Sequence, residues 1–201
     1  MAENMPPNLD DNYWSNRYTT HQTGWDIGMV STPIKTYIDQ LEDKNIQILI
    51  PGCGNAWEAL YLFDNGFKHV TLIDISSVLV NDIRKKFINT GYQVIHGDFF
   101  QHHNKYDLVL EQTFFCALHP AYRIEYVKHM YEILNPGGKL SGVLFNTYFD
   151  HGMNRPPFGG TMAEYDELFR HYFKTYNIEI CHNSINPRMG TEVWISVSKS
   201  L

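Results

Sequence analysis

The sequence lacks the features that mark membrane-spanning, secreted and nucleic-acid-binding proteins. None of its apolar runs approaches the roughly 18–20 residues that a membrane-spanning helix needs, and residues 1–10 lack the apolar segment of a secretory signal peptide. Only 19% of the residues are charged, the net charge is −6 and the basic residues do not cluster, which disfavours contact with nucleic acids or anionic membranes. We therefore expect a cytoplasmic protein that has no nucleic-acid or membrane partner.

Cysteine is scarce, and neither cysteine nor histidine is spaced as a metal site requires. The three cysteines, Cys53, Cys116 and Cys181, are far apart and odd in number, which is typical of reduced thiols in a cytoplasm. The ten histidines contain no H-E-x-x-H motif. We therefore expect no bound metal.

The alternation of strand-like and helix-like segments predicts a single α/β domain, since repeats and low-complexity segments are absent and 201 residues suit one core. The predicted strands span 46–50, 70–74, 92–96, 106–111, 139–146, 175–181 and 192–198, and the predicted helices span 13–20, 32–42, 56–66, 76–89, 120–134 and 161–173. This alternation is typical of a doubly wound, mainly parallel seven-stranded sheet, and the last two strands should form an antiparallel hairpin. We expect a loose tail over 1–10, an N-terminal cover over 1–45, a core over 46–201, and a monomer or weak dimer.

Polar residues at three helix starts are spaced for capping. Thr32 stands before a proline, which suits an N-cap followed by the first helical position. The pairs Asn55 with Glu58 and Thr161 with Glu164 have the spacing of a capping box, in which the second side chain bonds back to the cap.

A glycine turn after the first strand predicts an adenosyl cofactor. Gly52 and Gly54 let the backbone approach a ligand, and Asp74, 22 residues after Gly52 at the end of the next strand, can accept hydrogen bonds from ribose hydroxyls. A dinucleotide-binding turn needs a third small residue where this chain has Trp57. The cofactor is therefore predicted to be S-adenosylmethionine rather than a dinucleotide.

Further polar residues lie at the predicted strand ends, where open α/β sheets bind ligands. Asp98 either forms a turn or lies near the adenine, with Phe99 stacking on the base or supplying a backbone donor. Glu111 is either a structural carboxylate or a contact for the methionine end of the cofactor. Gln112 and Asn146 end their strands at the same edge.

Five stretches of the chain together resemble a known family. They are Trp14-x3-Tyr18-x6-Trp25-Asp26-x-Gly28, Ile50-Pro51-Gly52-Cys53-Gly54, Leu72-Ile73-Asp74-Ile75-Ser76, Phe114-Phe115-Cys116-Ala117-Leu118-x4-Arg123 and Asp150-His151-x4-Pro156-Pro157-Phe158. From about residue 12 onward the chain resembles class I S-adenosylmethionine-dependent methyltransferases, which have a Rossmann-like fold. Within them it is similar to the thiopurine S-methyltransferase superfamily, and most to its plant-type halide/thiol methyltransferase branch.

The resemblance implies a set of cofactor-binding residues. Those expected to close over or line the cofactor are Trp14, Tyr18, Trp25, Gly52, Gly54, Asp74, Ile75, Asp98, Phe99 and Gln112. Tyr18 stands where the family has a tryptophan, and Gln112 stands where the plant branch has a tyrosine. A second plant-branch tyrosine, after the fifth strand, becomes Phe145, with Tyr148 nearby. These departures leave the cofactor prediction intact and leave the acceptor open.

The chemistry expected of this site is methyl transfer to a small soft nucleophile, such as a thiol, thiopurine, thiocyanate, bisulfide or halide. Aromatic faces suit a sulfonium cation, and nucleophiles already ionised near pH 7 need positioning rather than a general base. Arg123, Tyr148 and Arg155 are the candidate residues on the acceptor side. We expect the N-terminal segment and the loop 147–160 to form a lid that opens for product release.

Three alternatives remain open at this point. An oxygen, nitrogen or metalloid acceptor would usually need a positioned base, for which His119 and His151 are candidates. A nicotinamide-dependent oxidoreductase is opposed by Trp57, and a non-catalytic cofactor-binding protein would bind the cofactor without turnover. Enzymes that methylate amino groups of bases or of glutamine resemble one another in an Asn/Asp-Pro-Pro-aromatic motif after strand four, and this chain has Glu111-Gln112-Thr113-Phe114 there.

Overall fold

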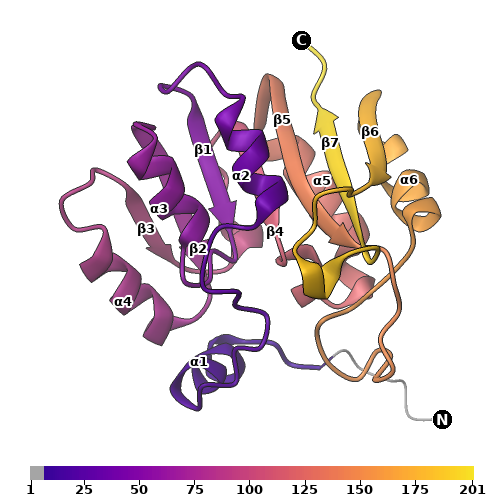
Figure 1. The fold of residues 1–201 in the computed structure, drawn as a ribbon, viewed down its shortest axis with the longest axis horizontal. Coiled ribbons are helices and arrows are strands. Elements are labelled where there is room, and N and C mark those ends of the chain that lie inside the picture. Colours follow the sequence, from indigo (N-terminus) through magenta and orange to yellow (C-terminus); the bar gives the residue numbers. More distant parts are fainter. Residues whose placement is uncertain (1–6) are drawn as a thin grey trace.

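A seven-stranded sheet forms the centre of the computed structural model, which describes residues 7–201 (Figure 1). Its strands are β1 (Gln47–Pro51), β2 (His69–Asp74), β3 (Gln93–His96), β4 (Tyr106–Gln112), β5 (Leu134–Phe145), β6 (Thr175–Ile180) and β7 (Glu192–Ser198). The order is β3-β2-β1-β4-β5-β7-β6, in which β7 alone is antiparallel to its neighbours β5 and β6. The predicted doubly wound sheet and the C-terminal hairpin are therefore confirmed.

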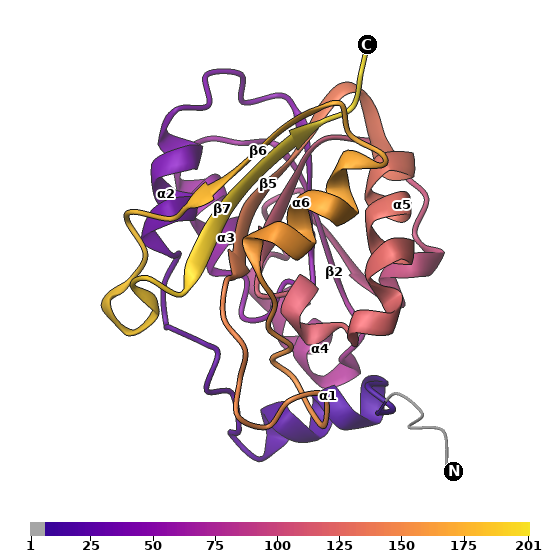
Figure 2. The same cartoon turned by 90° about the vertical axis from the view of Figure 1, so that its right-hand side faces the viewer.

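Helices cover both faces of the sheet because alternate strand residues point to opposite sides. Ile48 and Ile50 of β1 belong to one apolar core, together with α2 (Thr32–Asp39), α3 (Trp57–Asp64) and α4 (Ser77–Lys86). Leu49, between them, belongs to the other core, together with α5 (Arg123–Ile133) and α6 (Met162–Arg170). Figure 2 shows α2 and α3 on one side of the sheet and α5 and α6 on the other. These two layers hold the strand ends in fixed positions.

Two segments cover the carboxyl edge of the parallel strands. Helix α1 (Asp11–Thr19) and the loop 147–160 both lie at this end of the molecule (Figure 2). The Asp11 carboxylate accepts hydrogen bonds from the backbone N–H and the hydroxyl of Ser77, at 2.8 and 3.0 Å, so α1 docks on the N-terminus of α4. Helix α2 packs against the sheet. Within the predicted cover 1–45, the residues that line the cavity therefore come from the segment before α2.

Two of the three predicted caps are wrong, and one is confirmed. Ser31 rather than Thr32 is the N-cap of α2, and its hydroxyl donates to Gln112 Oε1 at 2.6 Å instead of capping the helix. Ala56 precedes α3 in a left-handed conformation, so Asn55 lies outside the helix and its amide bonds to Asp26. The Thr161 capping box with Glu164 at the start of α6 is present.

The element boundaries differ from the predicted ones at helix ends and at the start of β5, which begins at Leu134, five residues before the predicted start at 139. Helix α2 ends at Asp39 and α4 at Lys86, each three residues earlier than predicted. Of the predicted tail, residues 1–6 lie outside the described residues, and Asp10 caps α1 by accepting from the Tyr13 backbone N–H at 3.0 Å. Among residues 7–201, no helix combines the length and the apolar character that crossing a membrane requires.

Candidate active site

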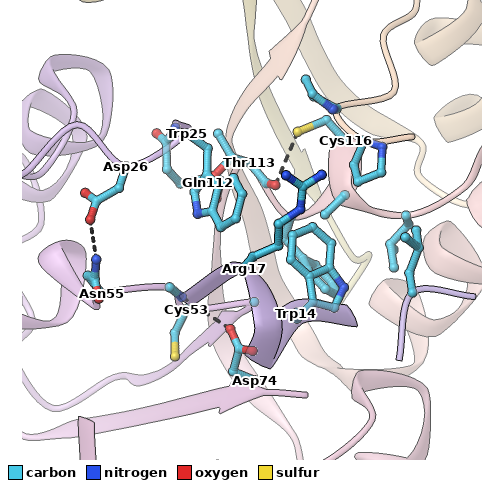
Figure 3. Close-up of a pocket in the computed structure, with 18 of the residues that line it drawn as sticks. Trp14, Arg17, Trp25, Asp26, Cys53, Asn55, Asp74, Gln112, Thr113 and Cys116 are labelled. Carbon is cyan, nitrogen blue, oxygen red and sulfur yellow. Dashed lines mark hydrogen bonds between the residues drawn. The ribbon is translucent and has the colours of Figure 1, made fainter. Parts of the chain in front are cut away.

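A cavity of about 720 Å³ lies at the carboxyl edge of the sheet, and residues of α1 and of the loop 147–160 are part of its wall. Figure 3 shows some of the residues that line it. Its volume lies in the range of small-molecule and cofactor sites. All ten residues predicted to bind the cofactor line it: Trp14, Tyr18, Trp25, Gly52, Gly54, Asp74, Ile75, Asp98, Phe99 and Gln112. The sheet topology brings these residues together from five separate parts of the chain.

The glycine turn after β1 has the backbone geometry that only glycine adopts readily. Gly52 and Gly54 have φ angles of +55° and +50°. A β-carbon at position 52 would overlap the ring of Phe114, which packs directly on this turn. The turn therefore depends on glycine for both its conformation and its fit against the β4 side of the cavity.

Asp74 ends β2 beside this turn, and its two carboxylate oxygens accept hydrogen bonds from different segments. It accepts hydrogen bonds from the Gly54 N–H at 3.3 Å and the Ser76 N–H at 2.9 Å. Burial raises the pKa of Asp74 to about 6, while these backbone donors act in the opposite direction. At neutral pH the side chain is therefore a fixed carboxylate that can accept further hydrogen bonds from a ligand.

Aromatic rings from the N-terminal segment cover the cavity. Trp25 packs edge-on against Trp14, with ring centroids 5.5 Å apart, and both are labelled in Figure 3. It also packs edge-on against Tyr18, with ring centroids 5.9 Å apart. Burial and the nearby Asp74 carboxylate raise the pKa of Tyr18, so its hydroxyl stays neutral. Electron-rich ring faces attract a cation whose hydration is weak, which makes this cover suitable for a sulfonium.

Asp98, Phe99 and Gln112 also line the cavity, Asp98 and Phe99 from the segment after β3 and Gln112 from the end of β4. The Asp98 carboxylate accepts from the Phe100 N–H at 2.9 Å and so begins a short 3₁₀ helix. Phe99 is buried and packs edge-on against Phe114, with ring centroids 5.1 Å apart. Since the Gln112 side chain is bonded to Ser31, it ties the cover segment to the tip of β4.

Glu111 is a structural carboxylate. It is fully buried, does not line the cavity, and accepts from the Tyr126 hydroxyl at 2.6 Å and from the Phe114 and Phe115 N–H groups at 2.8 and 2.9 Å. Burial raises its pKa to about 7. The two interpretations of Glu111 are thus separated: it fixes the Phe114–Phe115 turn and makes no contact with the cavity.

Only one of the three acceptor-side candidates reaches the cavity. Arg155 lines it. Arg123 lies behind it and donates to the Gly159 carbonyl at 2.7 Å, with its guanidinium over the ring of Phe115. Tyr148 is 63% exposed and donates to Glu164 at 2.8 Å. The placement of Arg123 and Tyr148 does not support contact with an acceptor. Arg123 bonds to the backbone of the loop 147–160, and Tyr148 links this loop to Glu164 of α6.

Two arginines that the sequence analysis missed line the cavity. Arg17 projects from α1, three residues after Trp14, and bonds to Gln22 and Tyr13 (Figure 3). Arg188 lies in the turn between β6 and β7 and donates to the Trp25 carbonyl at 2.7 Å. The helical spacing from Trp14 could have pointed to Arg17, but nothing in the sequence around Arg188 signals its position.

Neither candidate base reaches the cavity. His119 Nδ1 accepts from the Ala121 N–H at 3.2 Å, and His151 Nε2 lies 3.0 Å from the Pro157 carbonyl oxygen. Within residues 7–201, neither a histidine nor a lysine lines the cavity, and no cluster of three or more His, Cys, Asp or Glu side chains is placed to hold a metal ion. The residues present fit an adenosyl sulfonium: a carboxylate for ribose, glycine backbone and aromatic faces.

Comparisons with known proteins agree with this geometry. A family model described as Thiopurine S-methyltransferase (TPMT) matches residues 9–194. The chain is 30% identical over 186 residues to Probable thiol methyltransferase 2 of Arabidopsis thaliana, covering 89% of this chain and 81% of that protein. It is 25% identical over 200 residues to Thiocyanate methyltransferase 1 of Brassica oleracea, covering 96% and 87%. In fold it is similar to the Burkholderia thailandensis 1,6-didemethyltoxoflavin-N1-methyltransferase, with a TM-score of 0.73 at 15% identity and coverage of 95% and 87%.

Proposed function

Because the chain belongs to the thiopurine S-methyltransferase family, we propose that its acceptor is a small soft nucleophile: a thiol, thiopurine, thiocyanate, bisulfide or halide. The chain is an S-adenosylmethionine-dependent methyltransferase, so the predicted cofactor and reaction class are confirmed. One observation carries the choice of acceptor. Among the described residues, the cavity wall has arginines that attract an anion and has no histidine or lysine, and Glu58, its one carboxylate without a donor from another residue, is assigned to the cofactor below.

The residues that would hold the cofactor divide by chemistry. Asp74 would accept from the ribose hydroxyls, and Asp98 with Phe99 would border the adenine. Trp14, Tyr18 and Trp25 would face the sulfonium. When bound, S-adenosylmethionine supplies an electrophilic methyl group. The chain's own contribution is to hold a cation, align it with a nucleophile and exclude water from the cavity.

On the acceptor side, we assign Arg155 to contact an anionic nucleophile. It belongs to the loop 147–160, whose residues Thr147, Phe149, Pro156 and Pro157 also line the cavity. This loop and α1 would form the lid. A positive group at the rim attracts an anion without needing to remove a proton from it.

The alternative with an oxygen, nitrogen or metalloid acceptor requires a base, and His151 is the candidate to test. We expect His151→Gln to leave kcat with thiocyanate within about threefold of wild type, since the amide can still bond to the Pro157 carbonyl and a general base is not used. Steady-state kinetics of labelled-methyl transfer measures this. His69→Gln, at an exposed histidine at the other end of β2, is the matched control. A drop of 10²-fold or more in kcat at saturating acceptor would indicate a general base and favour the alternative.

The setting of the reaction is also a proposal. We place the enzyme in the cytoplasm, acting on a free small molecule rather than on nucleic acid, as a monomer or weak dimer. Support comes from the three buried free cysteines, which suit a reducing compartment, and from the net charge of −6, which gives no electrostatic attraction for nucleic acid.

A further inference from the structure

Four carboxylates line the cavity, and three of them already have hydrogen-bond donors from the protein. Asp26 accepts from the Trp57 indole N–H at 2.8 Å and from the Asn55 amide. Asp74 and Asp98 accept from backbone N–H groups at their own turns. Glu58 is the fourth. Across residues 7–201, it receives no hydrogen bond from another residue and forms no ion pair within 4.0 Å.

Glu58 is nevertheless buried, with 7% of its surface exposed. It lies in the first turn of α3, directly after the glycine turn. Its own backbone N–H is the one hydrogen-bond donor to this carboxylate among the described residues, and it lowers the pKa less than burial raises it. A buried carboxylate with so few donors is costly in free energy. Burial accordingly raises the pKa of Glu58 to about 7, and the neighbouring Asp26 acts in the same direction. A carboxylate kept in this position at a ligand cavity suggests that its partner arrives with the ligand.

The two cations that lower the pKa of Glu58, Arg188 and Lys86, do not supply that partner, because each has other contacts. Arg188 donates to the Trp25 carbonyl at 2.7 Å and lies 3.5 Å from Glu192. Lys86 donates to the Asn55 carbonyl at 3.0 Å and lies over the ring of Trp57. Both lower the pKa of Glu58 only as more distant charges.

We propose that Glu58 binds the α-ammonium of the methionine portion of the cofactor. This rests on the orientation proposed above, in which ribose lies at Asp74 and the sulfonium lies under Trp25. The amino-acid end then extends toward the glycine turn and the start of α3, where Asp26 bonds to Asn55 and Trp57 and is close enough to raise the pKa of Glu58. An ammonium has three donors and a positive charge, which Glu58 does not receive from any other residue that the structure describes.

The test compares two ligands that differ in the amino-acid portion. S-adenosylhomocysteine has the ammonium, and methylthioadenosine has the same nucleoside without it. By titration calorimetry, we expect Glu58→Gln to weaken binding of S-adenosylhomocysteine by about 10- to 100-fold, as expected when a charge-assisted hydrogen bond is lost. Binding of methylthioadenosine should stay within about twofold, because Glu58 does not touch the nucleoside. Glu42→Gln, an exposed glutamate after α2, is the matched control.

The other outcomes distinguish failure of the Glu58 assignment from failure of the proposed function. Equal weakening of both ligands would assign Glu58 a structural role and overturn the inference while leaving the proposed function intact. Unchanged binding of both ligands would also overturn it. If wild type bound neither ligand, the proposed function itself would fail. Should Glu58→Gln not fold, Glu58→Asp keeps the charge but shortens its reach, and it should lose affinity for S-adenosylhomocysteine alone.

Proton release gives a second readout. The titratable and charged groups around Glu58 are Asp26, Arg188, Lys86 and the Cys53 thiol. With a pKa of about 7, the free carboxyl is protonated in part at pH 7, and pairing with an ammonium favours its charged form. Binding of S-adenosylhomocysteine at pH 7 should therefore release about half a proton, measurable in buffers of different ionisation enthalpy. The release should be much smaller for methylthioadenosine and for Glu58→Gln.

Discussion

Asp74→Ala is expected to weaken binding of S-adenosylhomocysteine by about 100-fold or more. A carboxylate that accepts two ribose hydroxyls contributes about 1.5–3 kcal/mol per hydrogen bond, and each 1.4 kcal/mol is a factor of ten in affinity. The alanine also leaves the Gly54 and Ser76 N–H groups without their acceptor, which loosens the turn that the ligand contacts. Titration calorimetry at pH 8, where the wild-type carboxyl with its pKa of about 6 is ionised, gives the affinity.

Controls separate the loss of the ribose contact from a loss of folding. Asp82→Ala removes an exposed carboxylate on α4 that pairs with Lys85, so the variant should bind the ligand as wild type does. Asp74→Asn keeps one acceptor oxygen and should fall between the alanine variant and wild type. Thermal unfolding without ligand reports the stability of each variant. Wild-type affinity in Asp74→Ala would remove the ribose assignment.

Gly52→Ala should abolish measurable cofactor binding and lower the stability of the fold. A non-glycine residue in the left-handed region costs about 1–2 kcal/mol, and here the added methyl group also overlaps the Phe114 ring. The ring or the turn must therefore shift, and both line the cavity. Denaturant unfolding measures the free energy, and calorimetry with S-adenosylhomocysteine measures the binding.

Gly66→Ala is the matched control for this substitution. Gly66 has a φ of +82° but nothing within 4 Å of an added β-carbon, and it lies beyond the end of α3 away from the cavity. It should show the backbone cost alone and keep wild-type affinity. Adding Phe114→Ala to Gly52→Ala should recover part of the lost stability. If Gly52→Ala bound the cofactor normally, the close approach of the turn to the ligand would be contradicted.

The fold was predicted well because strand-like and helix-like segments alternate along the sequence, and this alternation is typical of a doubly wound parallel sheet. Once the strands are parallel and adjacent, the ends of β1 and β2 must meet, so strand order alone brings Gly52 and Asp74 together. The same reasoning placed Asp98 and Gln112 at that edge. Positions fixed by strand ends were therefore predictable from order and spacing.

Side-chain direction was much harder to predict. Arg123 and Tyr148 lie in segments that border the cavity, yet tertiary contacts with Gly159 and Glu164 turn them away from it. The spacing of Asn55 and Glu58 fits a capping box, but the left-handed Ala56 starts the helix one residue later and leaves Glu58 facing the cavity. Arg188 reaches the cavity through the long-range fold of the β6–β7 turn, which local sequence does not encode.

The most direct test of the central claim is methyl transfer from labelled S-adenosylmethionine to a panel of acceptors. The panel contains iodide, thiocyanate, bisulfide, thiophenol, a thiopurine, a catechol and a primary amine. A cavity without a histidine or lysine in its described wall predicts turnover confined to the sulfur and halide members. Turnover on the catechol or the amine alone would contradict the soft-nucleophile assignment and indicate that a carboxylate of the wall, such as Glu58, acts as a base.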